Sequence, residues 1–390
     1  MTFAQLALIS LVAILGPALS LSRGVHVPVV VGELLVGILV GRTGLGVLDP
    51  TSPTFQMLGD VGFALVMFVA GSHVPVRDRA LRAGARAGLG RALGVAALSV
   101  PAGTAIAHLF GTGHAALYTV LLASSSASLI LPSLDGAPLT GRSMEQMLPQ
   151  VAVADAACIV ALPLVIDPAH LRRAALGALL VVLAAAAVLV VLRWVERRGY
   201  RRHLHEVSED RGLALELRVS LTILFALAAL AQLSHVSIML AGFSFGIAVA
   251  AVGEPRRLTK QLFALTEGLF GPIFFVWLGS SLDLRTLASH PRAIGLGVAL
   301  GAAALLVHGL MALTRQHLAV ALTTSAELGV PVAAATTGAQ LGVLAPGEST
   351  AMLLGGILTI AVVAALSGPV AALARREAPG EHQHASPTSA

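Results

Sequence analysis

The sequence predicts an all-α polytopic membrane protein, and three observations support that prediction. Hydrophobic residues make up 56% of the 390 residues, and charged residues make up only 12%, whereas soluble domains contain about 25% charged residues. Mean hydropathy is +0.86. Apolar runs of about 20 residues, each long enough to cross a bilayer, follow one another with short polar breaks. The chain therefore divides into membrane spans rather than soluble domains.

Apolar runs between charged or turn-rich breaks predict about thirteen transmembrane helices. The expected spans are 3–21, 27–45, 54–74, 88–111, 114–134, 146–167, 172–195, 213–233, 236–253, 259–281, 293–314, 317–345 and 350–374. The first span has no basic segment before it and no convincing cleavage site, so we expect a retained helix and not a signal peptide. Residues 1–376 would form one transmembrane domain. The polar stretch 377–390 is predicted to be a disordered cytoplasmic tail.

The distribution of Arg and Lys predicts the orientation of these spans. With the N-terminus outside, 20 of the 25 basic residues lie in inner loops and inner helix ends, as the positive-inside rule requires. We therefore expect a multi-pass protein of the cell membrane, plasma or inner, with its N-terminus outside and its C-terminus cytoplasmic. Because the basic residues gather at helix ends, the net charge of +5 does not indicate a nucleic-acid partner.

The predicted spans divide into two halves around the longest hydrophilic segment, 196–211. The first helix begins outside, whereas the eighth begins inside. Two six-helix halves of opposite orientation, about 1–170 and 212–376, are typical of the inverted repeats of secondary transporters.

Two predicted spans look like broken helices. Span five contains Ala123–Ser128 and Pro132, and span twelve contains Gly329–Pro331 and then Ala335–Gly342, with Thr337 and Gln340. Each is the fifth helix of its half, and Gly/Pro-interrupted, hydroxyl-rich stretches at matching places indicate a binding site near the membrane midplane. For either stretch alone, the hydroxyl-bearing residues could be explained by bonds to their own backbone or by contacts that join two helices.

Asp155 is the most informative residue, because no other charge lies between Glu145 and Asp167. That gap is roughly one bilayer crossing. A carboxylate near the bilayer centre costs about 2.5–3.5 kcal/mol on insertion scales. Its default interpretation is an ion or proton site.

Other ionisable residues in the spans are Glu33, Asp60, Glu267, His308 and Glu327. Glu33 and Asp60 lie where they could cap a helix, form an ion pair or contact water. Glu267 is expected to pack against a neighbouring helix or to form a salt bridge. His308 is the strongly polar group of span eleven, and an imidazole can titrate near neutrality. A lone buried histidine is more often a satisfied hydrogen-bonding residue. His308, Glu327 and Glu33 are therefore supporting candidates.

Other motifs fail in context, so we expect a transporter and not an enzyme. Gly242-Phe-Ser244-Phe-Gly246 fits a nucleophile elbow, but it lies within an apolar helix with no strand before it. Its two glycines suit close helix packing instead, as do Gly37 and Gly41. No nucleotide-binding loop and no clustered Cys/His metal motif is present. We expect no cofactor, and an ion gradient is the remaining energy source.

Six parts of the chain share residues, in order, with one group of transporters: Pro28–Gly41, Ala64–Gly71, Ser124–Ala127, Asp155, Pro272–Asp283 and Glu327–Gly329. Together they resemble the monovalent cation:proton antiporters, which include bacterial sodium/proton antiporters and Kef-type potassium efflux systems. The resemblance implies exchange of Na⁺ or K⁺ for H⁺, a homodimer, and Asp155 as the essential acid of helix 6. We expect no nucleotide-binding regulatory domain on this chain.

Two residues depart from the family pattern. Ala154 stands where many members have Asp, Asn or Gln, and His308 is the expected equivalent of a Lys or Arg on helix 11. The second acidic partner and the permanent cation are thus absent. Asp155 is expected to carry the competition between proton and cation almost alone.

The expected ion- and proton-binding positions are Asp155, Ser126, Ser128 and Ala154, with Ser125, Thr337 and Gln340 in support. Burial disfavours the charged form of a carboxyl group. The site at Asp155 would therefore change sides of the membrane only when H⁺ or the transported metal cation neutralises it. One cation per proton is the predicted stoichiometry. The alternatives are an ion-coupled organic-anion transporter, an intramembrane hydrolase built from Ser, His and Asp, and a passive channel.

Overall fold

All regular secondary structure in the computed structural model is helical within the residues that it describes, which are 2–20, 29–72, 79–134, 137–138, 141–198, 213–253, 256–282, 284–289 and 291–378. No strand occurs among these residues. The part of the predicted tail from 379 to 390, and most of the hydrophilic segment after the seventh span, lie outside the described residues.

The elements follow one another along the whole described chain. They are α1 (Phe3–Ser20), α2 (Val29–Val40), α3 (Pro53–Ser72), α4 (Arg79–Phe110), α5 (Ala115–Ala123), α6 (Ala127–Ser133), α7 (Arg142–Ile166), η1 (Pro168–His170), α8 (Leu171–Arg197), α10 (Leu215–Leu233), α11 (Ile238–Val252), α12 (Arg256–Leu265), the π-helical η2 (Thr266–Phe270), α13 (Gly271–Ser281), α14 (Leu284–Ser289), α15 (Pro291–Gly309), η3 (Leu310–Thr314), α16 (Leu318–Thr323), α17 (Gly329–Leu341) and α18 (Glu348–Glu377).

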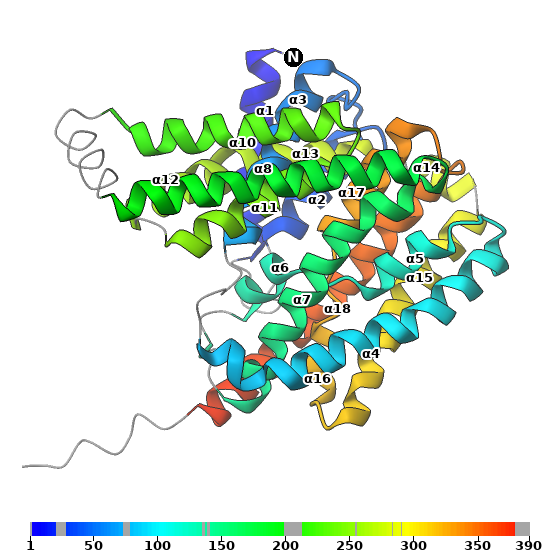
Figure 1. The fold of residues 1–390 in the computed structure, drawn as a ribbon. Helices are drawn as coiled ribbons and strands as arrows, with labels where there is room; N and C mark the ends of the chain where they lie inside the picture. Colours follow the sequence, from blue (N-terminus) through cyan, green and yellow to red (C-terminus); the bar gives the residue numbers. More distant parts are fainter. Residues whose placement is uncertain are drawn as a thin grey trace, which may run out of the picture.

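The helices pack as two bundles (Figure 1). In the α3 bundle, which comprises α1, α2, α3, α10, α11 and α13, the most extensive contacts join α3 to α11 and α2 to α13. In the α7 bundle, which comprises α4 to α7 and α15 to α18, α4 packs on α5 and α7, and α15 packs on α18. α8 lies along α11 and also touches α7, so it links the two bundles.

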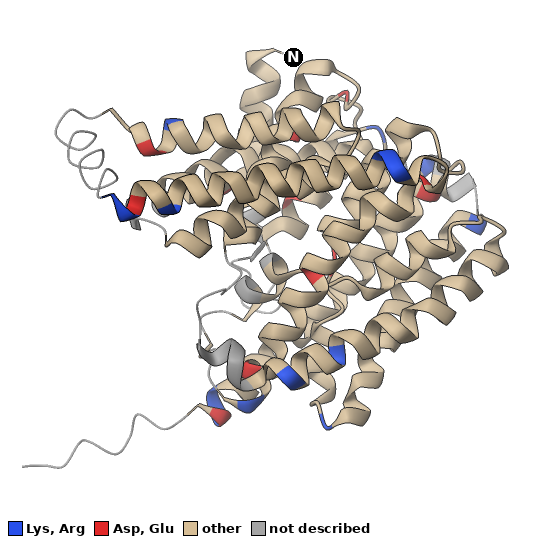
Figure 2. Ribbon diagram, viewed as in Figure 1, with Lys and Arg blue, Asp and Glu red and all other residues tan. Residues whose placement is uncertain are grey.

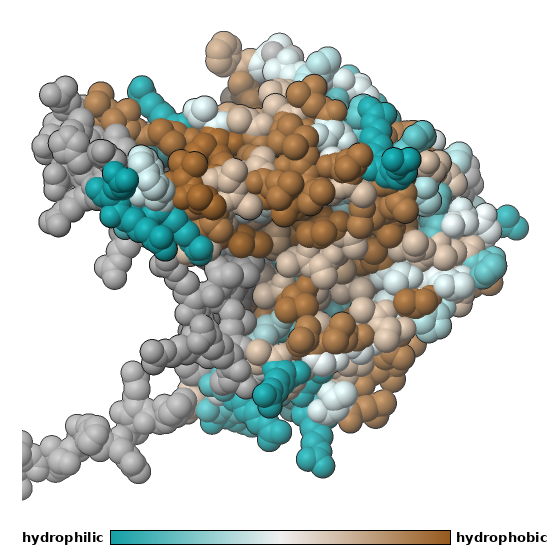
Figure 3. Space-filling model, viewed as in Figure 1, coloured by the Kyte–Doolittle hydropathy of each residue, from teal (hydrophilic) through white to brown (hydrophobic). Residues whose placement is uncertain are grey.

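Eight helices of the described part are long and apolar enough to cross a bilayer by length and composition, and three more apolar helices are shorter. Charged residues lie mostly near helix ends (Figure 2). Broad apolar areas cover the visible face between the hydrophilic ends (Figure 3). Large apolar side chains such as Leu176, Leu183 and Val190 on α8 are more than half exposed. Such a surface suits lipid chains, because helices satisfy their backbone internally.

Two of the predicted spans consist of two helices each. Span 114–134 divides into α5 and α6 around Ser124–Ser126, and span 317–345 divides into α16 and α17 around Thr324–Leu328. The second interruption therefore lies before the stretch in which we expected it. The expected interruption within Ala335–Gly342 is wrong, because all of that stretch except Gly342 belongs to α17. α17 is continuous from Gly329 to Leu341.

The physical reason lies in the positions of two residues of α17. Pro331 occupies the first turn, where a helix has no internal partner for its N–H groups and proline is tolerated. The Thr336 hydroxyl donates to the Val332 carbonyl oxygen at 2.8 Å, so it bonds its own helix rather than marking a break.

Glycines allow the tightest helix crossings of the α3 bundle. A Cβ on Gly37 of α2 would lie 3.0 Å from the Gly279 Cα of α13, and a Cβ on Gly41 would overlap Ser280. A Cβ on Gly246 of α11 would likewise overlap the backbone of α3 at Phe68. Small residues spaced by four let membrane helices approach closely, and the sequence predicted close packing at these glycines.

Replacement of Gly279 by valine should destabilise the protein, because the new Cβ would overlap the Leu34 carbonyl oxygen of α2. Overpacking of this kind costs about 1–3 kcal/mol or more, so the melting temperature in detergent should fall. Gly90 of α4 is the control, since a Cβ there meets open space, and Gly90→Ala should keep or raise the melting temperature. An unchanged melting temperature for Gly279→Val would contradict the close crossing of α2 and α13.

Candidate functional site

The two helix interruptions meet inside the α7 bundle and bond each other. The Ser124 hydroxyl donates to Oε2 of Glu327. The Ser125 hydroxyl donates to the Thr324 carbonyl oxygen at 2.7 Å. All of these side chains are at most 3% exposed, so each interruption supplies partners for polar groups of the other.

Asp155 lies on α7 directly beside this crossing. Its side chain is 6% exposed, and its Oδ2 accepts a hydrogen bond from the backbone N–H of Ala127, the first residue of α6, at 3.4 Å. Asp155 of α7 and Glu327 of the second interruption therefore both contact the first interruption or the residue that follows it, Asp155 at Ala127 and Glu327 at Ser124.

A chain of buried polar side chains runs from the crossing towards the loop after η3. Gln316 Nε2 donates to Gln150 Oε1 at 2.9 Å, and Gln150 Nε2 donates to Thr324 Oγ1 at 3.3 Å. The ring Nδ1 of His308 lies 2.8 Å from the same Thr324 hydroxyl. All four side chains are at most 7% exposed, so this series of hydrogen bonds is shielded from solvent.

Thr324 is the shared partner in these contacts. Its hydroxyl group lies 2.7 Å from the Ala321 carbonyl oxygen and 2.8 Å from Nδ1 of His308. The His308 ring also lies near the backbone carbonyls of Leu122 and Ser124, beside the first interruption. The Ser-His-Asp arrangement that an intramembrane hydrolase would need is absent from these bonds.

The structure brings together some of the site residues expected from the sequence and separates others. Asp155, Ala154, Ser125, Ser126, Glu327 and His308 are buried in the α7 bundle, at or near the crossing of the interruptions. Ser128 belongs to α6, but its side chain lies outside what the structure describes. Glu33 is buried on α2 in the other bundle, and Thr337 and Gln340 line a cavity on α17.

Sequence reasoning missed Gln150, Gln316 and Thr324. Gln150 could have been found, because it is a polar residue in an apolar span about one turn before Asp155. Thr324 could not, since its importance comes from contacts with residues far away in the sequence. Among the described residues, no three His, Cys, Asp or Glu side chains are grouped as a metal site.

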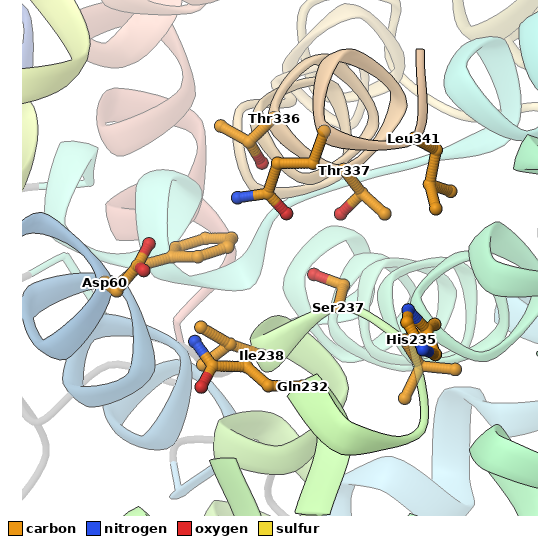
Figure 4. Close-up of a pocket in the computed structure, with 11 residues that line it drawn as sticks. Asp60, Gln232, His235, Ser237, Ile238, Thr336, Thr337 and Leu341 are labelled. Atoms are coloured by element: carbon orange, nitrogen blue, oxygen red, sulfur yellow. The ribbon is translucent and has the colours of Figure 1, made fainter. Parts of the chain in front are cut away.

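A cavity of about 200 Å³ lies between the two bundles. From the α3 bundle it is lined by Asp60 and Phe63 of α3 and by residues 232 and 235–238 at the α10–α11 turn. From the α7 bundle it is lined by Thr336, Thr337, Gln340 and Leu341 of α17. Figure 4 shows Asp60 across the cavity from the two threonines.

Residues 8–374 match the family model described as sodium/hydrogen exchanger, transmembrane. This match places the chain among membrane transporters and not among enzymes. The chain belongs to the sodium/hydrogen exchanger family.

Individual relatives agree with that assignment. The chain is 26% identical over 298 residues to YjbQ of Bacillus subtilis (strain 168), which is named as a Na⁺/H⁺ antiporter; the match covers 73% of this chain and 48% of YjbQ, so it spans about half of that relative. It is 25% identical over 291 residues to the Na⁺/H⁺-K⁺ antiporter GerN of Bacillus cereus, which covers 74% of this chain and 73% of GerN.

The fold is similar to that of the sodium proton antiporter MjNhaP1 from Methanocaldococcus jannaschii. The TM-score is 0.63 with 15% sequence identity, over 96% of this chain and 98% of that one. At this identity the likeness extends to the fold alone.

Thr324→Val should destabilise the site, because it leaves Nδ1 of His308 and the buried Nε2 donor of Gln150 without their hydroxyl partner. Each unsatisfied buried group costs about 1–3 kcal/mol, so the melting temperature in detergent should fall clearly. Thr323→Val is the matched control, since the Thr323 hydroxyl donates only to Ala319 of its own helix. Equal melting temperatures for the two variants would contradict the role given to Thr324.

Proposed function

We propose that this protein is a secondary antiporter that exchanges a monovalent cation, Na⁺ or K⁺, for H⁺, with Asp155 binding either ion. Membership of the sodium/hydrogen exchanger family supports the reaction. The observation that carries the proposal is the position of Asp155, a buried carboxyl group beside two helix interruptions that cross within the protein. Discontinuous helices of this kind form cation sites in secondary transporters.

The exchange follows from the free energy of burying charge. A carboxylate that is 6% exposed is strongly disfavoured unless an opposite charge or a proton neutralises it. Asp155 is neutral when it holds H⁺ or a monovalent cation, and only these loaded forms can change sides at low cost. The empty, charged form cannot, so the two movements are obligatorily coupled.

The cation would find its remaining ligands at the crossing. Alkali cations prefer oxygen ligands, and we propose that backbone oxygens of Ser124 and Ser125 and the hydroxyl groups of Ser126 and Ser128 supply them. Ala154 contributes no side-chain ligand, so Asp155 is the single carboxylate of the set. Glu327 has a different role, since its Oε2 is bonded by Ser124 and it holds the two interruptions together. His308, through Thr324, supports the same crossing.

We further propose thirteen membrane crossings in the cell membrane, with the N-terminus outside and the C-terminus cytoplasmic. The basic residues favour this orientation. The interrupted helices are then the fifth of each six-helix half, about 1–170 and 212–376, in keeping with an inverted repeat. A homodimer is proposed from the family resemblance.

Asp155→Asn should abolish exchange, because an amide neither binds a proton nor neutralises a cation. The measurement is the response of a pH-sensitive dye in proteoliposomes with a preset pH gradient, to which Na⁺ or K⁺ is added. Asp167→Asn, at the end of the same helix, is the control and should keep full exchange. Full exchange by Asp155→Asn would remove the basis of the proposal.

Exchange should be electroneutral, because a single carboxyl group carries one charge in either direction. Addition of Na⁺ or K⁺ to the protein in a planar membrane should therefore produce no current while protons still move. A sustained current that depends on the cation would rule out one cation per proton and would indicate a second charged carrier such as His308.

A further inference from the structure

The cavity between the bundles contains an acidic group that the proposed exchange cycle does not use. Asp60 lies in the first half of α3, an apolar helix long enough to cross a membrane. Its carboxyl group is partly exposed, into the cavity, and makes no hydrogen bond or ion pair with any described residue. An ionisable group in a membrane span is expensive, and it indicates a functional site when no partner neutralises it.

The rest of the cavity lining offers further oxygen atoms. Thr337 and the exposed Gln340 lie on α17, opposite Asp60, and the exposed Gln232 lies at the end of α10, on the same side as Asp60. Their side chains make no hydrogen bond with the part of the chain that the structure describes. The Thr336 hydroxyl donates to its own helix and keeps its lone pairs free to accept. Carboxylate, amide and hydroxyl oxygens are the ligands that hard cations prefer.

The size of the cavity fits a cation that keeps part of its hydration shell. Its volume of about 200 Å³ is several times the share of one water molecule, roughly 30 Å³. The sides of the cavity towards Phe63, Val236, Ile238 and Leu341 are apolar, which strengthens the field of a single carboxylate.

The cavity stops short of the crossing of the interrupted helices. A Cβ on Gly329, the first residue of α17, would lie 3.4 Å from Met67 Cε and 3.8 Å from Met239 Sδ. Both methionines are at most 5% exposed. Met67 follows Asp60 by two turns on α3, about 10 Å along the helix. These flexible side chains therefore pack against the residue that directly follows the second interruption, whereas the cavity is lined by α17 residues from Thr336 onwards.

We propose that this cavity is a capture site for a monovalent alkali cation, in which Asp60 binds the partly hydrated ion before it passes the methionines towards Asp155. This inference rests on the proposed antiport. Asp60 neutralises the ion, while Thr337, Gln340 and Gln232 replace part of its water shell. Because Asp60 belongs to the α3 bundle and Thr337 to the α7 bundle, the captured ion would contact both bundles.

The capture site predicts a selective change in the kinetics of exchange. Exchange in proteoliposomes is measured over a range of NaCl and of KCl, with choline chloride holding the ionic strength constant. Asp60→Asn should raise the apparent KM for both cations on the order of tenfold, as expected for loss of a charge that concentrates the substrate. The maximal rate should stay within about twofold, since the exchange chemistry at Asp155 is intact.

Two further variants keep the test decisive. Asp49→Asn is the matched control: this carboxylate lies in the loop before α3, bonded by Thr51, and its loss should leave both constants unchanged. Gln340→Leu, on the opposite wall, should raise the KM without removing a charge. If Asp60→Asn elutes as an aggregate in size-exclusion chromatography, the KM of Gln340→Leu tests the capture site in its place.

An unchanged KM, or a fall in the maximal rate alone, would overturn the capture site. Asp155→Asn separates the two proposals. If it abolishes exchange while Asp60→Asn leaves the KM unchanged, only the capture site is wrong. If it retains exchange, the proposed antiport itself is wrong.

Discussion

Two helices are interrupted deep within this protein, and the backbone groups released there must find partners without help from water. An unsatisfied polar group in such surroundings costs several kcal/mol. The hydrogen bonds from Ser124 to Glu327 and from Ser125 to the Thr324 carbonyl oxygen meet part of that requirement. They also tie the interruptions to each other. A buried carboxyl group, that of Asp155, lies beside this crossing, and we propose that a small cation binds there.

The rest of the α7 bundle holds Asp155 against this crossing. Gly84 and Gly88 let α4 approach α7 so closely that a Cβ at either would overlap α7. At the start of α7, the carboxylate of Glu377 from the end of α18 accepts hydrogen bonds from the Ser143 backbone N–H and hydroxyl, both at 2.7 Å, as an acidic group does at a helix N-terminus. On the side of the α7 bundle that meets the α3 bundle lies the cavity at Asp60.

Local patterns in the sequence predicted the features that depend on local chemistry. The apolar runs indicated the spans, the serines at 124–126 indicated the first interruption, and the isolation of Asp155 indicated a buried carboxyl group. The second interruption was misplaced, because Gly329 and Pro331 mark where α17 begins rather than where the chain is unwound. Thr337 and Gln340 were grouped with Asp155, but α17 directs them into the cavity instead. Contacts such as that of Gln150 with Thr324 join residues 174 positions apart, and no local pattern reports them.

The central claim is that one carboxyl group binds either a proton or a cation, so that each excludes the other. Calorimetric titration of the purified protein with NaCl or KCl, in buffers of different ionisation enthalpy, measures the protons released per cation bound. Competition at Asp155 predicts close to one proton released per cation below the pH at which the site loses its proton, with a cation Kd that rises about tenfold for each unit of pH decrease. Cation binding that releases no proton, with a Kd independent of pH, would contradict the account.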